Sequence, residues 1–226
     1  DTEILLQYFK IYGEKCVDYF EGMWSFAIYN IKKQELFLSR DRFAEKPLHY
    51  YVDSSGIFFG SEIKYLACLA NQKFRPDLNR VNKFLSLGYK SLFKERGTFF
   101  IDINQLIGAE NLLCNNNLKP TIKKYWTPKI KINNKISINE AVENTKKLLI
   151  NSVRLRMRSD VPLAFCLSGG VDSSGLASIA IKELNCKIKT FSIIDSDDRY
   201  NEINNINTTI KDLGCESEII ELSKSN

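Results

Sequence analysis

Two different patterns of hydrophobic and polar residues divide the chain. In its first part, apolar residues recur at helical spacing near the start and then fall into short runs between polar turns. From Ser137 onward, helical and strand patterns alternate instead. The first pattern predicts an α+β domain, and the second predicts an α/β domain with a parallel sheet.

The first part begins with the pattern of an amphipathic helix. Apolar residues from Ile4 to Tyr12 share one face behind Asp1, and Gly13 ends the pattern. The spacing of four later apolar runs predicts an antiparallel meander. These runs are 23–29, 36–38, 48–52 and 57–59, and helices are expected after them at 62–69 and 79–87. The first run is apolar on both faces, which favours a sheet covered on both sides.

The second part alternates between helix and strand. Ser137 and Glu140 have the spacing of a capping box, which predicts the start of a long helix. The following elements are a strand at 161–167, a helix at 173–184, a strand at 188–194, a helix ended by Gly214 and a strand at 218–222. Because helices join successive strands, we expect a parallel sheet. We place the domains at 1–128 and 137–226, with a polar linker at 129–136.

Composition and charge exclude several classes of protein. The chain has 226 residues, of which 44% are hydrophobic and 12% aromatic, as in globular domains. Its formal net charge of +5 is too small to indicate nucleic-acid binding. No apolar run reaches the roughly 18 residues of a membrane span, and the start lacks an export signal. We therefore expect a cytoplasmic protein that binds neither nucleic acid nor a membrane, and, because the chain begins with Asp, a fragment.

The cysteines and the single histidine offer no catalytic or zinc-binding spacing. The six cysteines are at 16, 68, 114, 166, 186 and 215, and we expect all of them to be free thiols. Cys16 and Cys166 have apolar neighbours, which predicts that both are core thiols. His49 lies within an apolar run and is predicted to be a strand residue rather than a zinc ligand or a triad base.

The strongest chemical signal lies between a predicted strand and a predicted helix. It reads Leu167-Ser168-Gly169-Gly170-Val171-Asp172-Ser173-Ser174. Backbone N–H groups at such a position can bind a phosphate, and glycines let it approach the main chain closely. Asp172 would repel a phosphate unless a divalent cation lay between them, so we infer Mg²⁺. The Lys of a Walker loop is missing, and the alternative is a plain Gly-Gly turn with Asp172 or Ser173 as N-cap.

This loop resembles the pyrophosphate loop of the N-type ATP pyrophosphatases, which cleave ATP between its α and β phosphates. With the flanking segments 159–162 and 190–193, it resembles the glutamine-dependent asparagine synthetase family. Segments 21–29, 40–48 and 59–64 are similar to the rear half of the class II glutaminase domain of that family. The resemblance implies the rear part of an Ntn-type αββα sandwich, followed by the start of a parallel-sheet adenine-nucleotide domain.

The resemblance also implies an activity and its participants. It implies ATP-dependent amidation of aspartate to asparagine with ammonia from glutamine, through an acyl-adenylate, with release of AMP and pyrophosphate. ATP and Mg²⁺ are the implied cofactors, glutamine, aspartate and ATP are the implied small-molecule partners, and a homodimer is compatible with it. The N-terminal Cys nucleophile of the family is absent from this sequence, so no catalytic residue is assigned.

The resemblance also implies roles for individual residues of this chain. Asp1 matches the residue that binds the α-amino group of glutamine, with a helix N-cap as its alternative. Leu167 and Ile193 match residues that line the adenine site, with core packing as their alternative. Loop residues 167–174 match the residues that bind ATP and pyrophosphate. Within the loop, Asp172 is expected to interact with a Mg²⁺ ion that pyrophosphate also binds.

Some positions depart from the family pattern and leave the acceptor open. They are Ala44, His49, the segment 107–109 and Asn201 before Glu202. The first alternative is an amidotransferase of the same build that acts on another carboxylate, such as a polysaccharide uronic acid. The second is a non-catalytic ATP-binding homologue. A purely structural protein is disfavoured, because it has no need of the segment 168–174.

Overall fold

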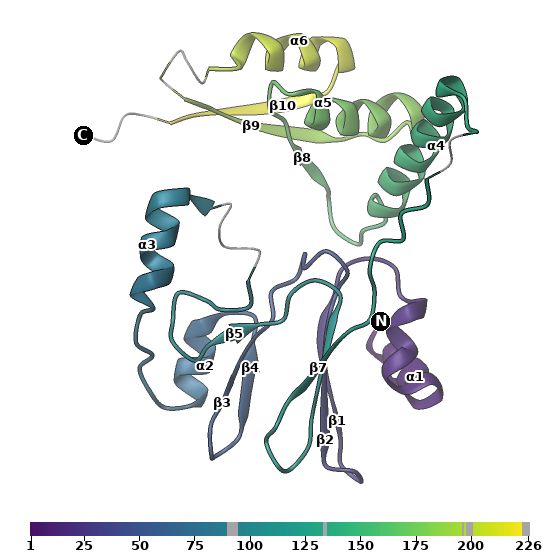
Figure 1. Cartoon of the computed structure of the whole chain (residues 1–226). Coiled ribbons are helices and arrows are strands. Elements are labelled where there is room, and N and C mark those ends of the chain that lie inside the picture. The colour runs from purple at the N-terminus through teal and green to yellow at the C-terminus, as the bar shows by residue number, and fades with distance from the viewer. Residues whose placement is uncertain (90–94, 133–134, 196, 198–200, 223–226) are drawn as a thin grey trace. The chain divides into compact units, whose positions relative to one another are not determined.

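The chain is described by a computed structural model that covers residues 1–89, 95–132, 135–195, 197 and 201–222. Its residues form two compact units, 1–130 and 131–226 (Figure 1). Among the described residues, no helix has both the length and the apolar character needed to cross a bilayer.

The first unit contains two antiparallel sheets. One has the strand order β1-β2-β6-β7, and the other has the order β4-β3-β5. The helices are α1 (Thr2–Tyr12), the 3-10 helix η1 (Gly13–Tyr19), α2 (Ile63–Leu69) and α3 (Leu78–Leu87). The strands are β1 (Ser25–Asn30), β2 (Glu35–Arg40), β3 (His49–Val52), β4 (Ile57–Gly60), β5 (Asn104–Gln105), β6 (Glu110–Cys114) and β7 (Thr121–Lys124).

The predicted meander is wrong, because the four runs form two hairpins in different sheets. Strands β1 and β2 pair in one sheet, β3 and β4 pair in the other, and β2 has β6 rather than β3 as its second neighbour. The hydrophobic pattern also did not predict β5, β6 or β7. The cause lies in the connection from β2 to β3, where the chain turns away from its own sheet.

The buried carboxylate of Asp41 organises this connection. Its Oδ1 accepts the N–H groups of Phe43 at 3.1 Å and Glu45 at 2.9 Å. Its Oδ2 accepts those of Lys46 at 2.9 Å and Trp24 at 3.3 Å. Because four backbone donors converge on one carboxylate, the chain leaves the first sheet directly after β2 and starts the second.

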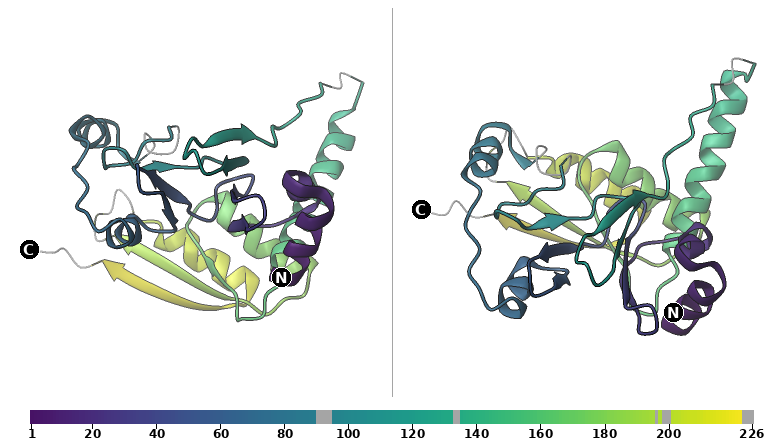
Figure 2. Two further views of the ribbon diagram at one scale, coloured as in Figure 1. Left: turned by 90° about the horizontal axis from the view of Figure 1, so that it is seen from below. Right: turned by 60° about the horizontal axis from the view of Figure 1, so that its bottom comes forward.

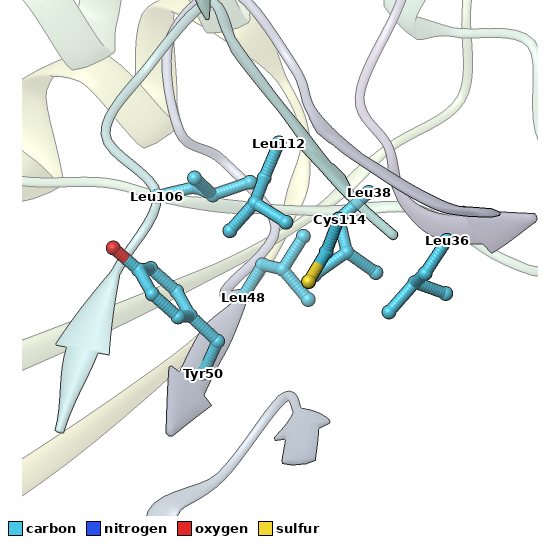
Figure 3. Packing of buried hydrophobic residues seen from close by; sticks show 7 residues of the cluster. All are labelled: Leu36, Leu38, Leu48, Tyr50, Leu106, Leu112 and Cys114. Carbon is cyan, nitrogen blue, oxygen red and sulfur yellow. The ribbon is translucent and has the colours of Figure 1, made fainter. Parts of the chain in front are cut away.

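The two sheets share one hydrophobic core, shown in Figure 3. Its buried members are Leu36, Leu38, Leu112 and Cys114 from the first sheet, and Leu48, Tyr50 and Leu106 from the segments of the second. On the other face of β2, Phe37 packs against Cys16 and Val17 of η1. The expected sheet with two covered faces is confirmed at β2, whereas in β1 the side chain of Tyr29 is 57% exposed.

Helices complete the outer layers of this unit. α1 and η1 lie on the first sheet through the cluster around Phe37. On the outer face of the second sheet, the fully buried Leu66 of α2 lies close to Gly60 of β4. The order of layers is therefore helix, sheet, sheet, helix. Membership of the Ntn class stays a prediction.

The second unit contains the predicted parallel sheet, with the strand order β10-β9-β8. Its elements are α4 (Ile138–Arg156), β8 (Ala164–Cys166), α5 (Val171–Ser178), the π-helix η3 (Ile179–Glu183), β9 (Lys189–Asp195), α6 (Ile203–Leu213) and β10 (Glu216–Leu222). β9 and β10 run side by side (Figure 1 and Figure 2). The capping box of Ser137 and Glu140 is confirmed, and so is the end of α6 at Gly214, which adopts a left-handed conformation.

Three details of this unit differ from the sequence predictions. The strand predicted at 161–167 spans only Ala164–Cys166, with one further backbone hydrogen bond from Leu167 to Phe191, and Val161 is exposed. The helix predicted from residue 173 begins at Val171. Cys166 is exposed rather than a core thiol. β8 is an edge strand, and the core of Leu167, Ile194 and Ile206 covers one face of the sheet only, so a residue on the other face stays in contact with solvent.

We expect Asp41→Asn to destabilise the first unit by about 2–4 kcal/mol. In either orientation, the new amide NH₂ group faces two backbone N–H donors and leaves both without an acceptor. Both tryptophans, Trp24 and Trp126, belong to this unit, so fluorescence in a urea titration reports its unfolding. The exposed Asp18→Asn variant is the control, and equal midpoints for the two variants would contradict the role given to Asp41.

Candidate functional site

The Gly-rich segment joins β8 to α5 at the carboxyl edge of the parallel sheet. The N–H of Leu167 donates to the carbonyl of Phe191 at 2.8 Å and so extends the contact with β9 by one residue. α5 begins at Val171 with Gly170 as its N-cap residue. The structure therefore brings the predicted loop residues together in one tight turn, at the place where parallel α/β sheets bind ligands.

Hydrogen bonds of serine hydroxyls hold this turn together. Ser173 Oγ accepts the N–H of Ser168 at 3.1 Å and lies 2.9 Å from Ser168 Oγ. The N–H of Gly170 donates to Ser168 Oγ at 3.3 Å, and Ser174 Oγ donates to the Gly170 carbonyl at 3.0 Å. In this geometry the hydroxyls of Ser168, Ser173 and Ser174 shape the turn, rather than stand ready as donors to a ligand.

The start of α5 leaves backbone donors for an anion. The N–H groups of Val171, Asp172 and Ser173 belong to the first helical turn, where a helix offers no carbonyl to accept them. None of the three donates to another residue in the described part of the chain. Together with the positive end of the helix dipole, such N–H groups bind phosphate or carboxylate.

The alternative in which Asp172 or Ser173 caps the helix is wrong. The helix begins two residues earlier than predicted, its N-cap is Gly170, and no side chain makes a capping hydrogen bond. The Asp172 side chain lies in the exposed first turn, so its carboxylate is adjacent to the unpaired N–H groups without being used by them. This arrangement would repel a bare phosphate.

The donor set around Asp172 fits Mg²⁺ held mainly by phosphate. Within the described ranges, no group of three or more His, Cys, Asp or Glu residues forms a metal cage. Mg²⁺ usually binds through one or two carboxylates, together with waters and substrate phosphates. Asp172 beside an anion-binding helix terminus supplies that kind of contact.

A carboxylate that the sequence analysis did not select also reaches the loop. Glu202 Oε2 accepts the N–H of Gly169 at 2.9 Å. A Cβ atom on Gly169 would lie 2.7 Å from Glu202 Cβ and 3.1 Å from Asn205 Cβ, so only glycine fits there. Glu202, Asn205 and Thr209 recur at helical spacing, and Thr209 Oγ1 lies 3.4 Å from Ser174 Oγ. That polar spacing at the start of α6 was the signal available in the sequence.

Leu167 and Ile193 lie at the carboxyl ends of neighbouring strands, but their side chains do not meet. Leu167 is buried in the core with Ile194 and Ile206, as its alternative role predicted. Ile193 precedes Ile194 in β9, so its side chain points to the other face of the sheet, where it is 65% exposed. Their roles toward adenine stay predictions.

Asp1 precedes α1, and its side chain is exposed. Its carbonyl accepts the N–H of Leu5 at 3.0 Å, but its carboxylate makes no capping hydrogen bond. The alternative role of this side chain as a helix cap is therefore not supported by a hydrogen bond. The carboxylate remains available to a positively charged group.

The environments of the cysteines and of His49 agree with structural rather than catalytic roles. All six cysteines are free, as predicted, and Cys16 is buried as a core thiol. Burial raises the pKa of the Cys16 thiol to about 11, so it stays protonated at neutral pH and is a poor nucleophile. His49 lies in β3 as predicted, with Nδ1 3.1 Å from the Ser61 carbonyl, and burial lowers its pKa.

Known proteins resemble both parts of the chain. The glutamine amidotransferase domain family matches residues 1–126, and the asparagine synthase family matches residues 144–226. A Methanocaldococcus jannaschii protein, named provisionally as a glutamine-hydrolyzing asparagine synthetase, is 35% identical over 202 residues, which are 85% of this chain and 38% of that protein. Asparagine synthetase (glutamine-hydrolyzing) 3 of Bacillus subtilis is 32% identical over 206 residues, covering 88% of this chain and 33% of its own length.

A third relative carries a different name. Amidase chyE of Penicillium rubens is 29% identical over 182 residues, which are 79% of this chain and 26% of that protein. The chain thus spans 38% and 33% of the length of the two relatives named as asparagine synthetases, and a smaller share of this one.

We expect Gly169→Ala to destabilise the second unit by about 1–3 kcal/mol. The new Cβ would clash with the Cβ atoms of Glu202 and Asn205, which cannot rotate away because they are bonded directly to the backbone. Amide hydrogen exchange of α6 measures the effect. Gly175→Ala is the matched control, because nothing lies within 4 Å of its Cβ position and alanine favours a helix by up to about 1 kcal/mol. Equal exchange in the two variants would show that the contact is not tight.

Proposed function

This chain belongs to the glutamine amidotransferase family and continues into an asparagine synthase domain, and we propose that it serves the ATP-dependent amidation of aspartate with ammonia from glutamine. One observation carries the proposal. At the carboxyl edge of the parallel sheet, the unpaired N–H groups of residues 171–173 stand beside the exposed carboxylate of Asp172. That combination suits pyrophosphate with a bound cation.

The proposed reaction has two steps. An oxygen of the aspartate side-chain carboxylate attacks the α-phosphorus of ATP, the bond to pyrophosphate breaks, and an acyl-adenylate forms. Ammonia then attacks the acyl carbon, AMP departs and a proton is released, which leaves asparagine. Negative charge grows on the departing pyrophosphate in the first step. The N–H groups of 171–173, already oriented by α5, stabilise that charge without reorganisation.

Asp172 is the loop residue that would hold Mg²⁺ through the pyrophosphate oxygens. When bound, the ion neutralises charge between the carboxylate and the phosphates. The exposed position of Asp172 in the first helical turn supports this role. Ser168 and Ser173 contribute by keeping the turn closed, through the hydrogen bonds between them.

The first unit would bind glutamine, with Asp1 as the partner of its α-amino group. A carboxylate facing an ammonium forms a charge-assisted hydrogen bond. The uncapped carboxylate of Asp1 supports the assignment. We also propose domain limits of 1–128 and 137–226 with a linker at 129–136, a cytoplasmic location and a homodimer.

Asp172→Asn tests the metal role in the complete protein. We expect ATP–pyrophosphate exchange to fall by about two orders of magnitude, with weaker magnesium dependence and unchanged unfolding, because the substitution removes one electrostatic element of the site. Asp212→Asn is the control, since Asp212 is an exposed residue of α6 that pairs with Lys182. An unchanged exchange rate with an unchanged magnesium requirement would rule out a metal role for Asp172.

A comparison of acceptors tests the substrate. We expect AMP release by the complete protein with aspartate, and at least about 100-fold less with glucuronate or galacturonate, because a polar site discriminates strongly between acceptors that place their groups differently. The names of the synthetase relatives favour aspartate. Faster AMP release with a uronic acid than with aspartate would contradict aspartate as the substrate and identify the uronic acid in its place.

A further inference from the structure

Glu202 connects two loops at the carboxyl edge of the parallel sheet. It directly precedes α6, after β9, whereas Gly169 follows β8. The 2.9 Å hydrogen bond from the Gly169 N–H to Glu202 Oε2 therefore joins the two neighbouring strand-to-helix connections. Because the acceptor is a carboxylate, this bond is stronger than one between neutral groups.

Both ends of this contact are anchored in the same core. Leu167, two residues before Gly169, packs with Ile206, four residues after Glu202. Asn205 approaches the loop from the same helical face, with its Nδ2 3.5 Å from the Gly169 carbonyl, and Asn201 Oδ1 accepts the Ile203 N–H at 3.0 Å. The backbone at the start of α6 is thus held close against the loop.

The contact divides the backbone donors of the loop into two sets. The N–H groups of Ser168, Gly169 and Gly170 are taken by Ser173 Oγ, Glu202 Oε2 and Ser168 Oγ. Those of residues 171–173 have no acceptor among the described residues. The first set maintains the shape of the loop, and the second is free to meet an anion.

We propose that Glu202 is a positioning residue for the pyrophosphate loop: it holds the Gly169 N–H and leaves phosphate binding to residues 171–173. The inference rests on the proposed function of the loop. It changes the predicted role of Gly169, which serves by lacking a side chain next to Glu202 rather than by donating to phosphate. The inference also explains why the Glu202 carboxylate does not exclude an anion. That carboxylate contacts the Gly169 N–H, whereas the anion would bind the N–H groups of residues 171–173.

Two variants of Glu202 separate positioning from competition with phosphate. Glu202→Ala removes the acceptor, whereas Glu202→Gln keeps an oxygen that can accept the Gly169 N–H. With inorganic pyrophosphate and Mg²⁺ as the probe, we expect calorimetry to show affinity about tenfold or more lower in the Ala variant and within about threefold of the parent in the Gln variant. Glu221→Ala, at an exposed position of β10, is the control with unchanged affinity.

Amide spectra and hydrogen exchange add readouts that do not depend on activity. The Gly169 amide should exchange about tenfold or more faster in Glu202→Ala and near the parent rate in Glu202→Gln. In the parent, pyrophosphate should shift the amide signals of 171–173 much more than that of Gly169. These results together would support positioning.

Different failures have different meanings. Higher affinity in Glu202→Ala, with a large shift of the Gly169 signal, would show that Glu202 competes with phosphate and would overturn the inference. Unchanged affinity and exchange in that variant would do the same, while leaving the proposed function intact. If the parent chain binds no pyrophosphate, the proposed function of the loop fails, and the inference fails with it.

Discussion

Carboxylate side chains accept backbone N–H groups where the chain leaves a strand, and this interaction occurs in both units. In the first unit, Asp41 accepts four N–H groups and directs the chain from one sheet into the other. In the second, Glu202 accepts the Gly169 N–H at the edge of the parallel sheet. The sheets provide the packed core, and these two contacts determine where the chain goes when it leaves a strand.

Hydrogen bonding also divides the backbone donors of the candidate site. The N–H groups of residues 168–170 are paired within the protein, whereas those of residues 171–173 have no acceptor among the described residues. A turn whose donors were all paired could not bind an anion through its backbone. In the proposed function, the negative charge of Asp172 requires a cation between its carboxylate and a bound phosphate. The proposed function assigns the departing pyrophosphate to this loop, and the missing Walker lysine argues against the transfer of a terminal phosphate.

Elements with strong local signals were predictable, and those that depend on distant partners were not. The capping box before α4 and the glycine after α6 act within a few residues, and the structure has both of them. β6 was not predicted although it is central to its sheet, because its short run Glu110–Cys114 is held by pairing with the distant β2 and with β7. The core position predicted for Cys166 failed for a similar reason, since apolar neighbours in sequence do not tell which face of a sheet is covered.

By itself, the sequence determined the two pattern types, the parallel α/β character of the second part and the position of the Gly-rich loop between a strand and a helix. Periodicity, caps and glycine runs are local properties, so they can be read without a structure. Only the tertiary structure decided that the first two hairpins belong to separate sheets, that Ser168 and Ser173 of the loop hydrogen-bond to each other, and that Glu202 accepts the Gly169 N–H. Gly169 and Glu202 are 33 residues apart, and the core shared by Leu167 and Ile206 holds their segments side by side. Hydrogen bonds between distant segments depend on the packing that brings those segments together, and no local pattern encodes that packing.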